Sequence, residues 1–503
     1  MTETMTTHYD LLIVGGGVNG TAIARAAAVA GQRVLLVEKD DLAQATSSAS
    51  TKLMHGGLRY LEYYEFKLVH EALKERAVML KTAPHLVYPL EFRLPHDKSV
   101  RPWWMVRAGL LLYDMFALGG GLPRSRAVRL DDPELKTSAK RGFSYYDGWV
   151  DDARLVVLNA RDAADLGAEI ATHTRFVSAR REEDQWAAVV ADASGARHIS
   201  ARMIVNAGGP WVDRVLREGL GINQRGASRL VRGSHIIVHR CLGGDYAWLL
   251  QQPDGRVVFA IPYLDNFTLI GTTDVPVAAA EEAQVSDDER DYLLAAANLY
   301  LQKPLVVTDI VGAYAGIRPL FDDGAGDAKA VSRDYHLELN SHGAPLLSVF
   351  GGKITTARHL AEVALAKLGI AGGDTRKRPL PGGDFDNFET FLSGVRARWP
   401  FLAPDIAHRL ARAYGTRINA VLRNAASMDD LGHDFGAGLT AQEVDYCVAQ
   451  EWARSVDDIL WRRTKLGIRL SAAQVEQLRC YLDEKVGHAG ERFNPGATSA
   501  AVA

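Results

Sequence analysis

The chain has 503 residues, which is enough for two or three domains and a sizeable core. Its 58 basic and 61 acidic residues leave a formal net charge of -3, so the composition indicates no basic surface and no nucleic-acid partner is expected. The three cysteines, Cys241, Cys447 and Cys480, are far apart and form no Cys-x-x-Cys pair. Neither a disulfide framework nor a metal site is therefore expected, and a reducing cytoplasmic setting fits this usage.

The first predicted elements form a strand–helix–strand unit. An apolar strand over 10–14 runs into a glycine-rich turn, an alanine-rich helix follows over 21–30, and a second apolar strand over 33–37 ends at Glu38. The turn has the pattern Gly15-x-Gly17-x-x-Gly20. Strand, turn, helix and terminal acid in this order are typical of the unit that binds an adenine dinucleotide.

Each residue type in this unit has a physical reason. Gly15 allows the tight turn, Gly17 lets the backbone approach a pyrophosphate, and Gly20 lets the helix pack closely against the strand. The helix N-terminus then faces the phosphates, and Glu38 can bond the ribose hydroxyls. The alternative, a glycine-rich turn without a ligand, leaves the shared register of strand, helix and acid unexplained.

Two further glycine turns favour FAD over NAD. The segment 45–62 combines a run of small hydroxyl residues with Gly56 and Gly57, which can wrap a pyrophosphate and let backbone approach a flat ring system. Far away, Gly351-Gly352-Lys353 opens another predicted helix, whose N-terminal dipole suits the ring end of an extended flavin. Each Gly-Gly pair taken singly is equally consistent with an ordinary turn, and only the combination indicates FAD.

The middle of the chain alternates between helical and strand patterns. Apolar residues at helical spacing predict helices over 62–81 and 151–170, the second of which ends near Gly167. An apolar strand over 201–206 runs into a Gly-Gly-Pro turn. A period of two over 234–274 predicts antiparallel strands.

The last part of the chain is predominantly helical. Strand, glycine turn and amphipathic helix return over 346–365, and a Pro/Gly-rich linker follows at 378–384. Beyond the linker, residues 385–490 show the pattern of successive helices.

One apolar stretch has two interpretations. Residues 103–118 are mainly aromatic and aliphatic, and they are broken by Arg107 and Asp114 and flanked by Arg101, Arg124, Arg126 and Arg129. This composition suits a helix that lies in a membrane interface. A helix that packs into the core with solvated ends is the alternative that composition alone favours. No run of about 18 uncharged apolar residues occurs, so no segment is expected to span a bilayer.

Several motifs together resemble those of the FAD-dependent glycerol-3-phosphate dehydrogenases, the aerobic, quinone-linked family. They are TSSASTKLMHGGLRYLE, YYDGWVDDARLV, NAGGPWV, RGSHIIV, IGTTD, GIRPL, SRDYHL, LLSVFGGKITTAR and, near the C-terminus, WRRTKLG. The similarity extends from about Tyr9 through the helical tail, which is nearly the whole chain.

The resemblance implies an α/β fold with a Rossmann-like FAD-binding domain of the glutathione-reductase/DAO type. This domain is expected to be discontinuous, with residues 1–84, 149–233 and 340–378. An antiparallel-sheet substrate-binding domain is expected from 85–148 and 234–339, and an all-α C-terminal domain from 385–495.

The implied reaction is the oxidation of sn-glycerol 3-phosphate to dihydroxyacetone phosphate by hydride transfer from C2 to FAD, with the electrons passed to membrane quinone. An oxidase that uses oxygen and a non-catalytic flavin-binding redox or interaction protein remain as alternatives. Because quinone is confined to the bilayer, the resemblance implies a cytoplasmic enzyme that associates peripherally with the lipid bilayer, at the inner face of the cytoplasmic membrane. A homodimer is left open.

This reaction needs cations for a phosphate dianion and a base for the C2 hydroxyl proton. Arginine offers phosphate a planar fork and lysine a point charge, while histidine has the ordinary pKa nearest neutrality. The predicted substrate-binding residues are Arg59, Tyr60, His235, Arg318, Arg333 and Lys353. The predicted catalytic residues are His55, Arg318 and Lys353, with His55 as the favoured base and His235 as the alternate. For Arg333, which precedes Asp334, an ordinary ion pair is the competing interpretation.

The predicted FAD-binding residues come from four segments. They are Gly15, Gly17, Asn19, Gly20 and Glu38; then Thr46, Ser47, Ser48, Ser50, Lys52, Leu53 and Gly57; then Gly208, Gly209 and Trp211; and finally Gly351, Gly352, Lys353 and Thr355. The hydroxyl side chains are assigned to the pyrophosphate as a group, because any single Ser or Thr among them could instead cap a helix.

Overall fold

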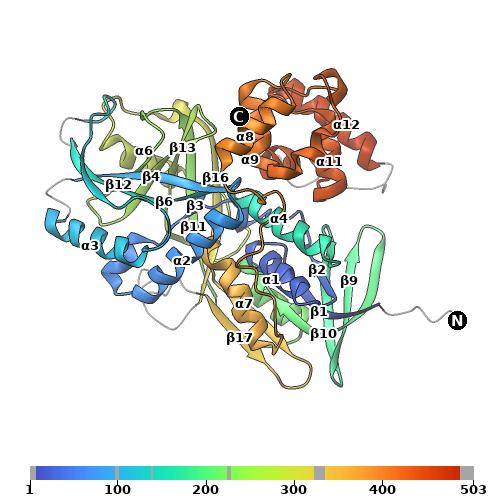
Figure 1. Cartoon of the computed structure of the whole chain (residues 1–503). Helices are drawn as coiled ribbons and strands as arrows, with labels where there is room; N and C mark the ends of the chain where they lie inside the picture. Colours follow the sequence, from blue (N-terminus) through green and yellow to red (C-terminus); the bar gives the residue numbers. More distant parts are fainter. Residues whose placement is uncertain (1–6, 97–100, 137–139, 224–227, 322–334, 488–503) are drawn as a thin grey trace.

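The computed structural model describes residues 7–96, 101–136, 140–223, 228–321 and 335–487. It contains two large sheets and a helical C-terminal unit (Figure 1). The first sheet lies at the lower right of Figure 1, the second at the left, and the helical unit at the upper right.

The first sheet is the nucleotide-binding type that the glycine turn predicts. Its strand order is β17-β18-β10-β1-β2-β7, and the β8–β9 hairpin is attached to β10. The central pairs β1/β2, β1/β10, β10/β18 and β2/β7 are parallel. The bounds are Thr7–Val14 for β1, Val34–Val37 for β2, Glu169–Ala171 for β7, Arg175–Glu182 for β8, Gln185–Asp192 for β9, Gly195–Asn206 for β10, His336–Asn340 for β17 and Leu346–Phe350 for β18. Strand β17, which the sequence-based division places on the substrate side, pairs with β18 in this sheet.

Three helices cover one face of this sheet. Helix α1 (Val18–Val29) packs against both α4 (Asp152–Asp165) and α7 (Ala357–Lys367). Alanine at five buried positions between 22 and 28 keeps α1 thin enough for this close packing, and together with β1, β2 and β18 the helices form one apolar cluster.

The second sheet has ten strands and is mixed. Its order is β15-β11-β14-β13-β12-β4-β6-β3, with β16 on β11 and β5 on β6. The bounds are Leu53–Met54 for β3, Val87–Pro95 for β4, Arg126–Arg129 for β5, Arg141–Val150 for β6, Ser228–His239 for β11, Ala247–Gln251 for β12, Val257–Tyr263 for β13, Phe267–Gly271 for β14, Val275–Pro276 for β15 and Ile310–Phe321 for β16. The predicted antiparallel strands over 234–274 are confirmed. A wholly antiparallel sheet is wrong, because β4 and β12, from two distant parts of the chain, meet in parallel.

Two predicted helices have different ends. The helix predicted over 62–81 is α2 (Phe66–Thr82), because residues Leu58–Tyr63 form the 3-10 helix η2 and Tyr64 follows with a left-handed φ of 60°. The helix predicted over 151–170 is α4, which ends at Asp165; its predicted end near Gly167 is confirmed, since Gly167 turns the chain with φ 95° into β7, and only the outer bound of 170 is too long. In both cases a residue with positive φ breaks a pattern that apolar spacing alone would continue.

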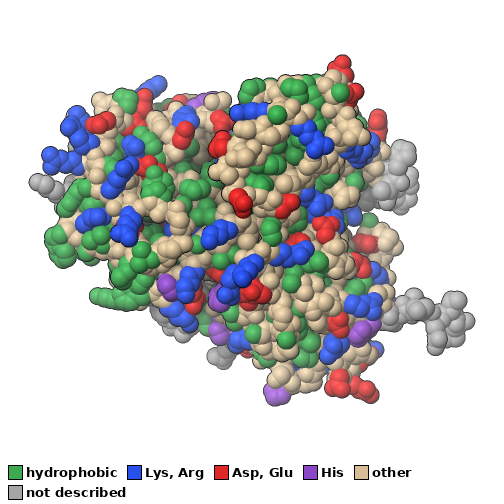
Figure 2. Space-filling view, in the orientation of Figure 1, with side chains coloured by type: hydrophobic (Ala, Val, Ile, Leu, Met, Phe, Trp, Pro, Cys, Tyr) green, Lys and Arg blue, Asp and Glu red, His purple; other side chains and the backbone are tan. Residues whose placement is uncertain are grey.

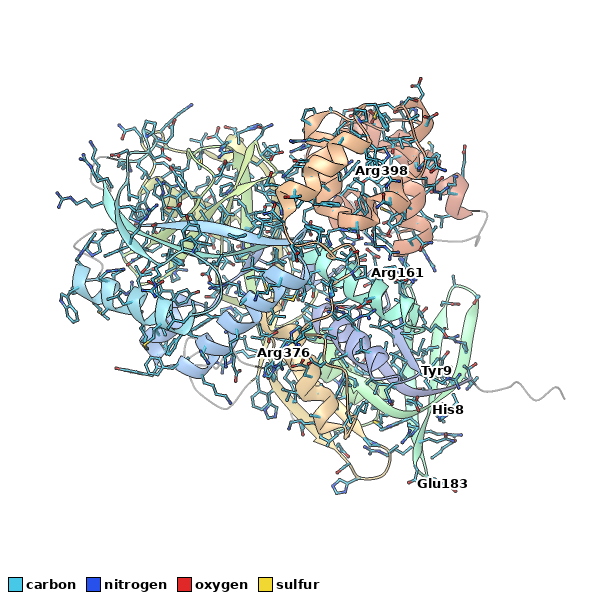
Figure 3. The ribbon with its side chains drawn as sticks, viewed as in Figure 1. His8, Tyr9, Arg161, Glu183, Arg376 and Arg398 are labelled. Atoms are coloured by element: carbon cyan, nitrogen blue, oxygen red, sulfur yellow. The ribbon has the colours of Figure 1, made fainter. Side chains whose placement is uncertain are left out.

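The C-terminal unit is all helical, as predicted, and is bonded tightly to the first sheet unit. Its helices are α8 (Phe388–Arg398), α9 (Pro404–Tyr414), α10 (Ile418–Leu422), α11 (Ala441–Glu451), the π-helix η10 (Asp458–Arg463) and α12 (Ala472–Gly487). Arg462 and Arg463 both contact Asp41 across the junction, at 2.6 and 2.7 Å, and Arg154 of α4 is bonded to Glu451. Figure 3 shows Arg161 at the same junction. Residues 488–495 of the predicted domain lie outside the described part of the chain.

Helix α3 (Trp103–Phe116) lies at the edge of the molecule and has two apolar faces. Val106, Leu110 and Tyr113 are buried. On the opposite face Trp104 is 72 % exposed, Leu111 51 % and Met115 55 %. The exposed face continues through Leu118 and, on the neighbouring segment, Tyr63, Tyr64 and Phe66; we call these seven residues the α3 face. Figure 2 shows hydrophobic side chains gathered at this lower left edge.

Among the described residues, no helix is long and apolar enough to cross a membrane. Helix α6 (Asp287–Asn298) packs against β11, β13 and β14 of the second sheet.

Candidate active site

The first glycine turn is shaped by contacts that a side chain would block. Gly15 has φ +114°, and a Cβ atom there would lie 2.4 Å from the carbonyl oxygen of Ala207. A Cβ at Gly20 would lie 1.9 Å from the carbonyl oxygen of Gly15, which is where α1 meets the turn. A Cβ at Gly17 would lie 3.2 Å from the Ser47 hydroxyl, a tight contact with a side chain and not with backbone. The crowding at Gly15 and Gly20 is consistent with a tight turn and a closely packed helix, and the approach of Gly17 to a pyrophosphate stays a prediction.

Glu38 lies at the end of β2 and is held by backbone amides. The N–H of Gly16 donates to Glu38 Oε2 at 2.7 Å, and the N–H of Asp40 donates to Oε1 at 3.0 Å. Burial raises the pKa of the Glu38 carboxyl, while these two hydrogen bonds act in the opposite direction. The carboxylate is thus fixed beside the glycine turn, in the place where a ribose would be recognised.

These residues border an elongated pocket of about 190 Å³. Eleven of the predicted cofactor residues line it: Gly15, Gly17, Asn19, Glu38, Thr46, Ser47, Gly208, Gly209, Trp211, Gly351 and Gly352. Sequence reasoning missed Lys39, Gln44, Arg175, Phe176 and Pro319, which also line it. Arg175 and Phe176 begin an antiparallel strand without a motif, so only the fold places them there.

The other predicted cofactor residues do not line the pocket. They are Gly20, Ser48, Ser50, Lys52, Leu53, Gly57, Lys353 and Thr355. Several of them hold the loop that forms the walls. The Lys52 ammonium and the Ser50 hydroxyl both donate to Asp152, at 2.9 and 2.7 Å, and Lys52 also donates to the Ser48 carbonyl at 3.0 Å. The N–H of Val18 in turn donates to Ser47 Oγ at 2.9 Å, which ties this loop to α1.

The second glycine turn meets the first through Asn19. The Asn19 amide donates to the carbonyl oxygen of Gly351 at 3.0 Å. Gly352 has φ +99°, and a Cβ there would lie 2.7 Å from Asn19 Nδ2. The turns at residues 15–20 and 351–353 therefore lie side by side, although more than three hundred residues separate them in the sequence.

A row of residues crosses the second sheet beside this loop. Phe259, Gly271, His235 and Tyr314 are opposite one another on β13, β14, β11 and β16. A Cβ at Gly271 would lie 2.0 Å from His235 Cδ2, and the His235 ring stacks on Tyr314 at 4.9 Å. His235 Nε2 is 3.0 Å from the Thr51 hydroxyl. Burial, together with the charges of Arg318 and Lys52, holds the pKa of His235 well below its ordinary value, so the imidazole is neutral at pH 7.

The segment after Thr51 carries the other predicted histidine and the predicted tyrosine. The ring of His55 lies edge-on to Phe259, with 6.3 Å between centroids, and the Thr355 hydroxyl is 3.5 Å from the His55 carbonyl oxygen. The Lys353 ammonium lies 4.0 Å from the centroid of the Tyr60 ring, in cation–π contact. The structure thus brings His55, Tyr60 and Lys353 together at the second glycine turn.

Arg318 is positioned by the turn that follows β14. Its guanidinium contacts the Asp274 carboxylate at 2.6 Å and donates to the Thr272 hydroxyl at 3.0 Å. It is about one quarter exposed, and its charge depresses the pKa of His235, so the two predicted residues are neighbours. Arg59 lies on η2 next to Tyr60. Arg333 lies outside the described residues.

These features fit an extended flavin dinucleotide. The cradle at Gly15 and Gly17 excludes side chains, the fixed Glu38 carboxylate stands beside it, and the Asn19 amide joins the cradle to the second glycine turn. His55 and Lys353 lie at the second turn, and His235 and Arg318 lie on the adjoining sheet, so a reacting ring would end there. Glu38, Gly351 and Gly352 all line the pocket, so these residues would hold the dinucleotide.

Comparisons with known families agree with this arrangement. Residues 10–358 match the FAD dependent oxidoreductase family, and residues 373–483 match the C-terminal domain of alpha-glycerophosphate oxidase. Together the two matches cover both sheets and the helical unit.

Individual relatives cover nearly the full chain. A glycerol-3-phosphate dehydrogenase from Pseudomonas aeruginosa is 48 % identical over 95 % of this chain and 96 % of its own. A D-erythritol 1-phosphate dehydrogenase from Brucella abortus is 47 % identical over 92 % and 96 %. The crystal structure of the glycerol-3-phosphate dehydrogenase from Bacillus halodurans complexed with FAD superposes with a TM-score of 0.77 and 28 % identity, and covers 97 % of this chain and 92 % of that one.

Proposed function

Because this chain belongs to the family of FAD-dependent glycerol-3-phosphate dehydrogenases, we propose that it oxidises sn-glycerol 3-phosphate to dihydroxyacetone phosphate and passes the electrons to membrane quinone. The cofactor is FAD. The observation that carries the proposed reaction is that His55, Tyr60 and Lys353 lie at the second glycine turn while His235 and Arg318 are neighbours on the adjoining sheet. When bound, FAD supplies the acceptor for the hydride that leaves C2 of the substrate.

Two cations would bind the substrate phosphate and the developing alkoxide. The carboxylate of Asp274 and the hydroxyl of Thr272 orient the Arg318 guanidinium, and the Tyr60 ring orients the Lys353 ammonium. A preoriented guanidinium reaches a phosphate dianion with a two-pronged hydrogen bond, because the fork geometry is fixed. The positive charge of either group also stabilises an alkoxide that forms at C2.

The base for the C2 hydroxyl is one of two histidines. His55 remains the favoured base: its backbone carbonyl lies 3.5 Å from the Thr355 hydroxyl, and its ring lies edge-on to Phe259, which is in the same row of the second sheet as His235. His235 is the alternate; it is neutral at pH 7, which is the form that accepts a proton, and its low pKa makes it a weak base. His55→Gln and His235→Gln distinguish them: the base variant lowers kcat strongly and removes the acid limb of the pH profile, whereas the other raises KM or leaves both constants unchanged.

A second substrate is favoured by a specific observation. The D-erythritol 1-phosphate dehydrogenase is as similar to this chain as the Pseudomonas enzyme is. Both substrates are polyol phosphates with a secondary alcohol, so the same cations and base would serve either. The ratio of kcat/KM for glycerol 3-phosphate and D-erythritol 1-phosphate decides between the two substrates. The electron acceptor is a separate question: stoichiometric formation of peroxide in the absence of quinone would identify an oxidase.

The α3 face supports peripheral binding at the inner face of the cytoplasmic membrane. Trp104, Leu111, Met115 and Leu118 recur along one side of the helix at spacings of seven, four and three, and all are more than half exposed. An apolar helical stripe with aromatic residues is typical of a helix that lies in the interface. The flanking arginines contribute less than the sequence suggests, because Arg101 pairs with Glu62 and Arg107 donates to Ser125, whereas Arg124 and Arg126 stay exposed.

Flotation with liposomes tests this surface. A variant that combines Trp104→Glu, Leu111→Glu and Met115→Glu should no longer bind vesicles that contain anionic lipid. Its activity with a soluble dye should persist. The matched control replaces Leu299, Val306 and Val307, which are similarly exposed apolar residues on another surface, by glutamate. Release of the control variant, with the α3 variant still bound to the vesicles, would show that the α3 face is not the membrane contact.

A further inference from the structure

A second cavity, outside the cofactor pocket, lies where α2, the end of α3 and α7 meet. Its volume is about 510 Å³. Its apolar wall comes from Leu73, Ala77 and Val78 of α2 and from Phe116 and Leu118 at the end of α3. Its polar wall comes from Glu71, Lys74, Glu75, His359 and Arg376. Figure 3 shows Arg376 between α2 and α7. We call this cavity the α2–α7 groove.

Only the side chain of Leu73 separates the floor of the groove from the turn at Gly56, which is assigned to the flavin. Leu73 lines the groove, and a Cβ on Gly56 would lie 2.7 Å from the Leu73 side chain. Helix α2 also packs against residues Ile354–Thr356, which follow Lys353. Helix α7 starts directly after them and carries His359 into the groove wall. The groove therefore backs onto both glycine turns that are assigned to the ring end of FAD.

The mouth of the groove is continuous with the proposed membrane surface. Leu118 belongs to both the α3 face and the groove, and Phe116, which contacts Phe66 of that face, also lines the groove. A molecule that lay with its polar head in the groove could therefore extend an apolar tail over Leu118 into lipid.

The charges around the groove suit a neutral ligand. Arg358 is buried and bonded to both oxygens of Glu75 at 2.7 Å, and it also pairs with Glu362. Arg376 and His359 pair with the same Glu362, at 3.0 and 3.5 Å. Because these carboxylates balance the cations, a phosphate dianion would gain little there, whereas carbonyl oxygens could accept hydrogen bonds from Lys74, His359 and Arg376.

From these observations we propose that the α2–α7 groove binds the ring of the membrane quinone and that His359 supplies a proton to it. This proposal rests on the proposed function, since it locates the electron acceptor of that reaction. The quinone takes up two electrons and two protons and becomes a hydroquinone. The two electrons and one proton are those of the hydride removed from C2, and the second proton leaves His359, which solvent reprotonates.

The environment of His359 suits such a donor. Hydrogen bonding to Glu362 raises the pKa of the His359 imidazole above its ordinary value. The Glu362 carboxylate thus favours the protonated form of the ring, and the side chain is 29 % exposed, so that it can exchange protons with solvent.

Photolabelling locates the quinone directly. The probe is a short-chain ubiquinone analogue with an azido group, added to the oxidised FAD-loaded protein in detergent, so that neither turnover nor membrane docking affects the result. We expect label on the α2 peptide around residues 71–78 or on residues 116–120, and competition by unlabelled short-chain ubiquinone. Label confined to other peptides would overturn the proposal.

Stopped-flow kinetics test the same site independently. Ala77→Phe fills the groove from its apolar wall, and Ala295→Phe makes the same change at an exposed alanine of α6. Ala77→Phe should slow reoxidation of the reduced enzyme by quinone at least tenfold and lose the photolabel, while reduction by glycerol 3-phosphate keeps its rate. His359→Gln should retain the label, slow reoxidation and abolish its dependence on pH.

Different results would contradict the proposed function and the proposed quinone site. If wild-type flavin is not reduced by a polyol phosphate, the proposed function is wrong, yet photolabelling of the oxidised protein still shows whether the groove holds a quinone. If reduction is normal and Ala77→Phe is reoxidised by quinone as fast as Ala295→Phe, the groove is not the acceptor site. Should Ala77→Phe fail to fold, the labelled peptide of the wild-type protein decides.

Discussion

Asp152 holds the loop that forms part of the cofactor pocket, and its replacement by asparagine should uncouple that loop. The Asp152 carboxylate is fully buried and accepts from the Lys52 ammonium at 2.9 and 3.0 Å and from the Ser50 hydroxyl at 2.7 Å. Lys465 of the helical unit approaches it at 3.7 Å. An asparagine side chain at this position would keep the volume but remove the charge that compensates two buried ammonium groups.

The loss of stability expected for Asp152→Asn follows from the burial of Lys52. Its side chain is 3 % exposed, and burial, with the nearby charge of Lys465, lowers the pKa of its ammonium although Asp152 acts in the opposite direction. Without Asp152 the lysine must either stay charged in the interior or lose its proton; at pH 7 neutralising a lysine of ordinary pKa about 10.4 costs about 4.6 kcal/mol. Breaking a buried pair by removing one partner typically costs about 3–5 kcal/mol, which agrees.

The assay is thermal unfolding of the purified protein together with its FAD content. Asp152→Asn should lower the unfolding midpoint by roughly 6–20 °C, if the sheet unit melts like a domain of about 150–250 residues, and should reduce the bound FAD. The control is Asp165→Asn, where the carboxylate is 39 % exposed and pairs with Arg161 and Arg417. It should shift the free energy of unfolding by at most about 1 kcal/mol. Equal midpoints and equal FAD content for the two variants would refute the assigned role of Asp152.

Three other changes test separate parts of the account. Arg318→Ala should lower kcat/KM for glycerol 3-phosphate about a hundredfold, since a lost charge-assisted bond in a catalytic site costs about 2–4 kcal/mol, with FAD content unchanged; wild-type kinetics would remove Arg318 from the site. Gly20→Ala should yield protein without FAD, because the new Cβ would lie 1.9 Å from the Gly15 carbonyl oxygen, whereas Gly109→Ala, with nothing within 4 Å, should be yellow. Burial lowers the pKa of His85 to about 3 from its ordinary value, so the unfolded chain binds an extra proton below about pH 6.5 and stability falls with acid, by about 1.4 kcal/mol for each pH unit. His85→Gln should therefore flatten the loss of stability between pH 6.5 and 5, and an unchanged slope would contradict this.

The sequence predicts the nucleotide-binding half well because its signals are local. The strand, the glycine turn, α1 and Glu38 occupy fewer than forty consecutive residues, and each has a steric or hydrogen-bonding reason to be there. The second glycine turn is equally visible, but nothing local shows that Asn19 joins the two turns, since that bond links residues 332 positions apart.

The second sheet and the ends of several helices are less accessible to sequence reasoning. Strand β4 contains Pro89, Glu91 and Arg93, and its neighbours β6 and β12 come from other parts of the chain, so neither composition nor spacing identifies it. The same limit applies to Arg175 and Phe176, which the fold brings to the pocket, and to Asp152, whose partners lie a hundred residues away.

Helix α3 shows where a pattern is ambiguous on physical grounds. Residues 103–118 are apolar on both faces, and only the structure shows that Val106 and Leu110 face inwards while Trp104 and Leu111 face outwards. Likewise, only the structure shows that Arg101 and Arg107 are engaged within the protein.

Anaerobic mixing of the FAD-loaded protein with sn-glycerol 3-phosphate tests the central claim most directly. The absorbance of the oxidised flavin should bleach in a single turnover, with one dihydroxyacetone phosphate formed for each flavin reduced, and added quinone should restore the colour. A flavin that dithionite bleaches but glycerol 3-phosphate leaves oxidised would contradict it.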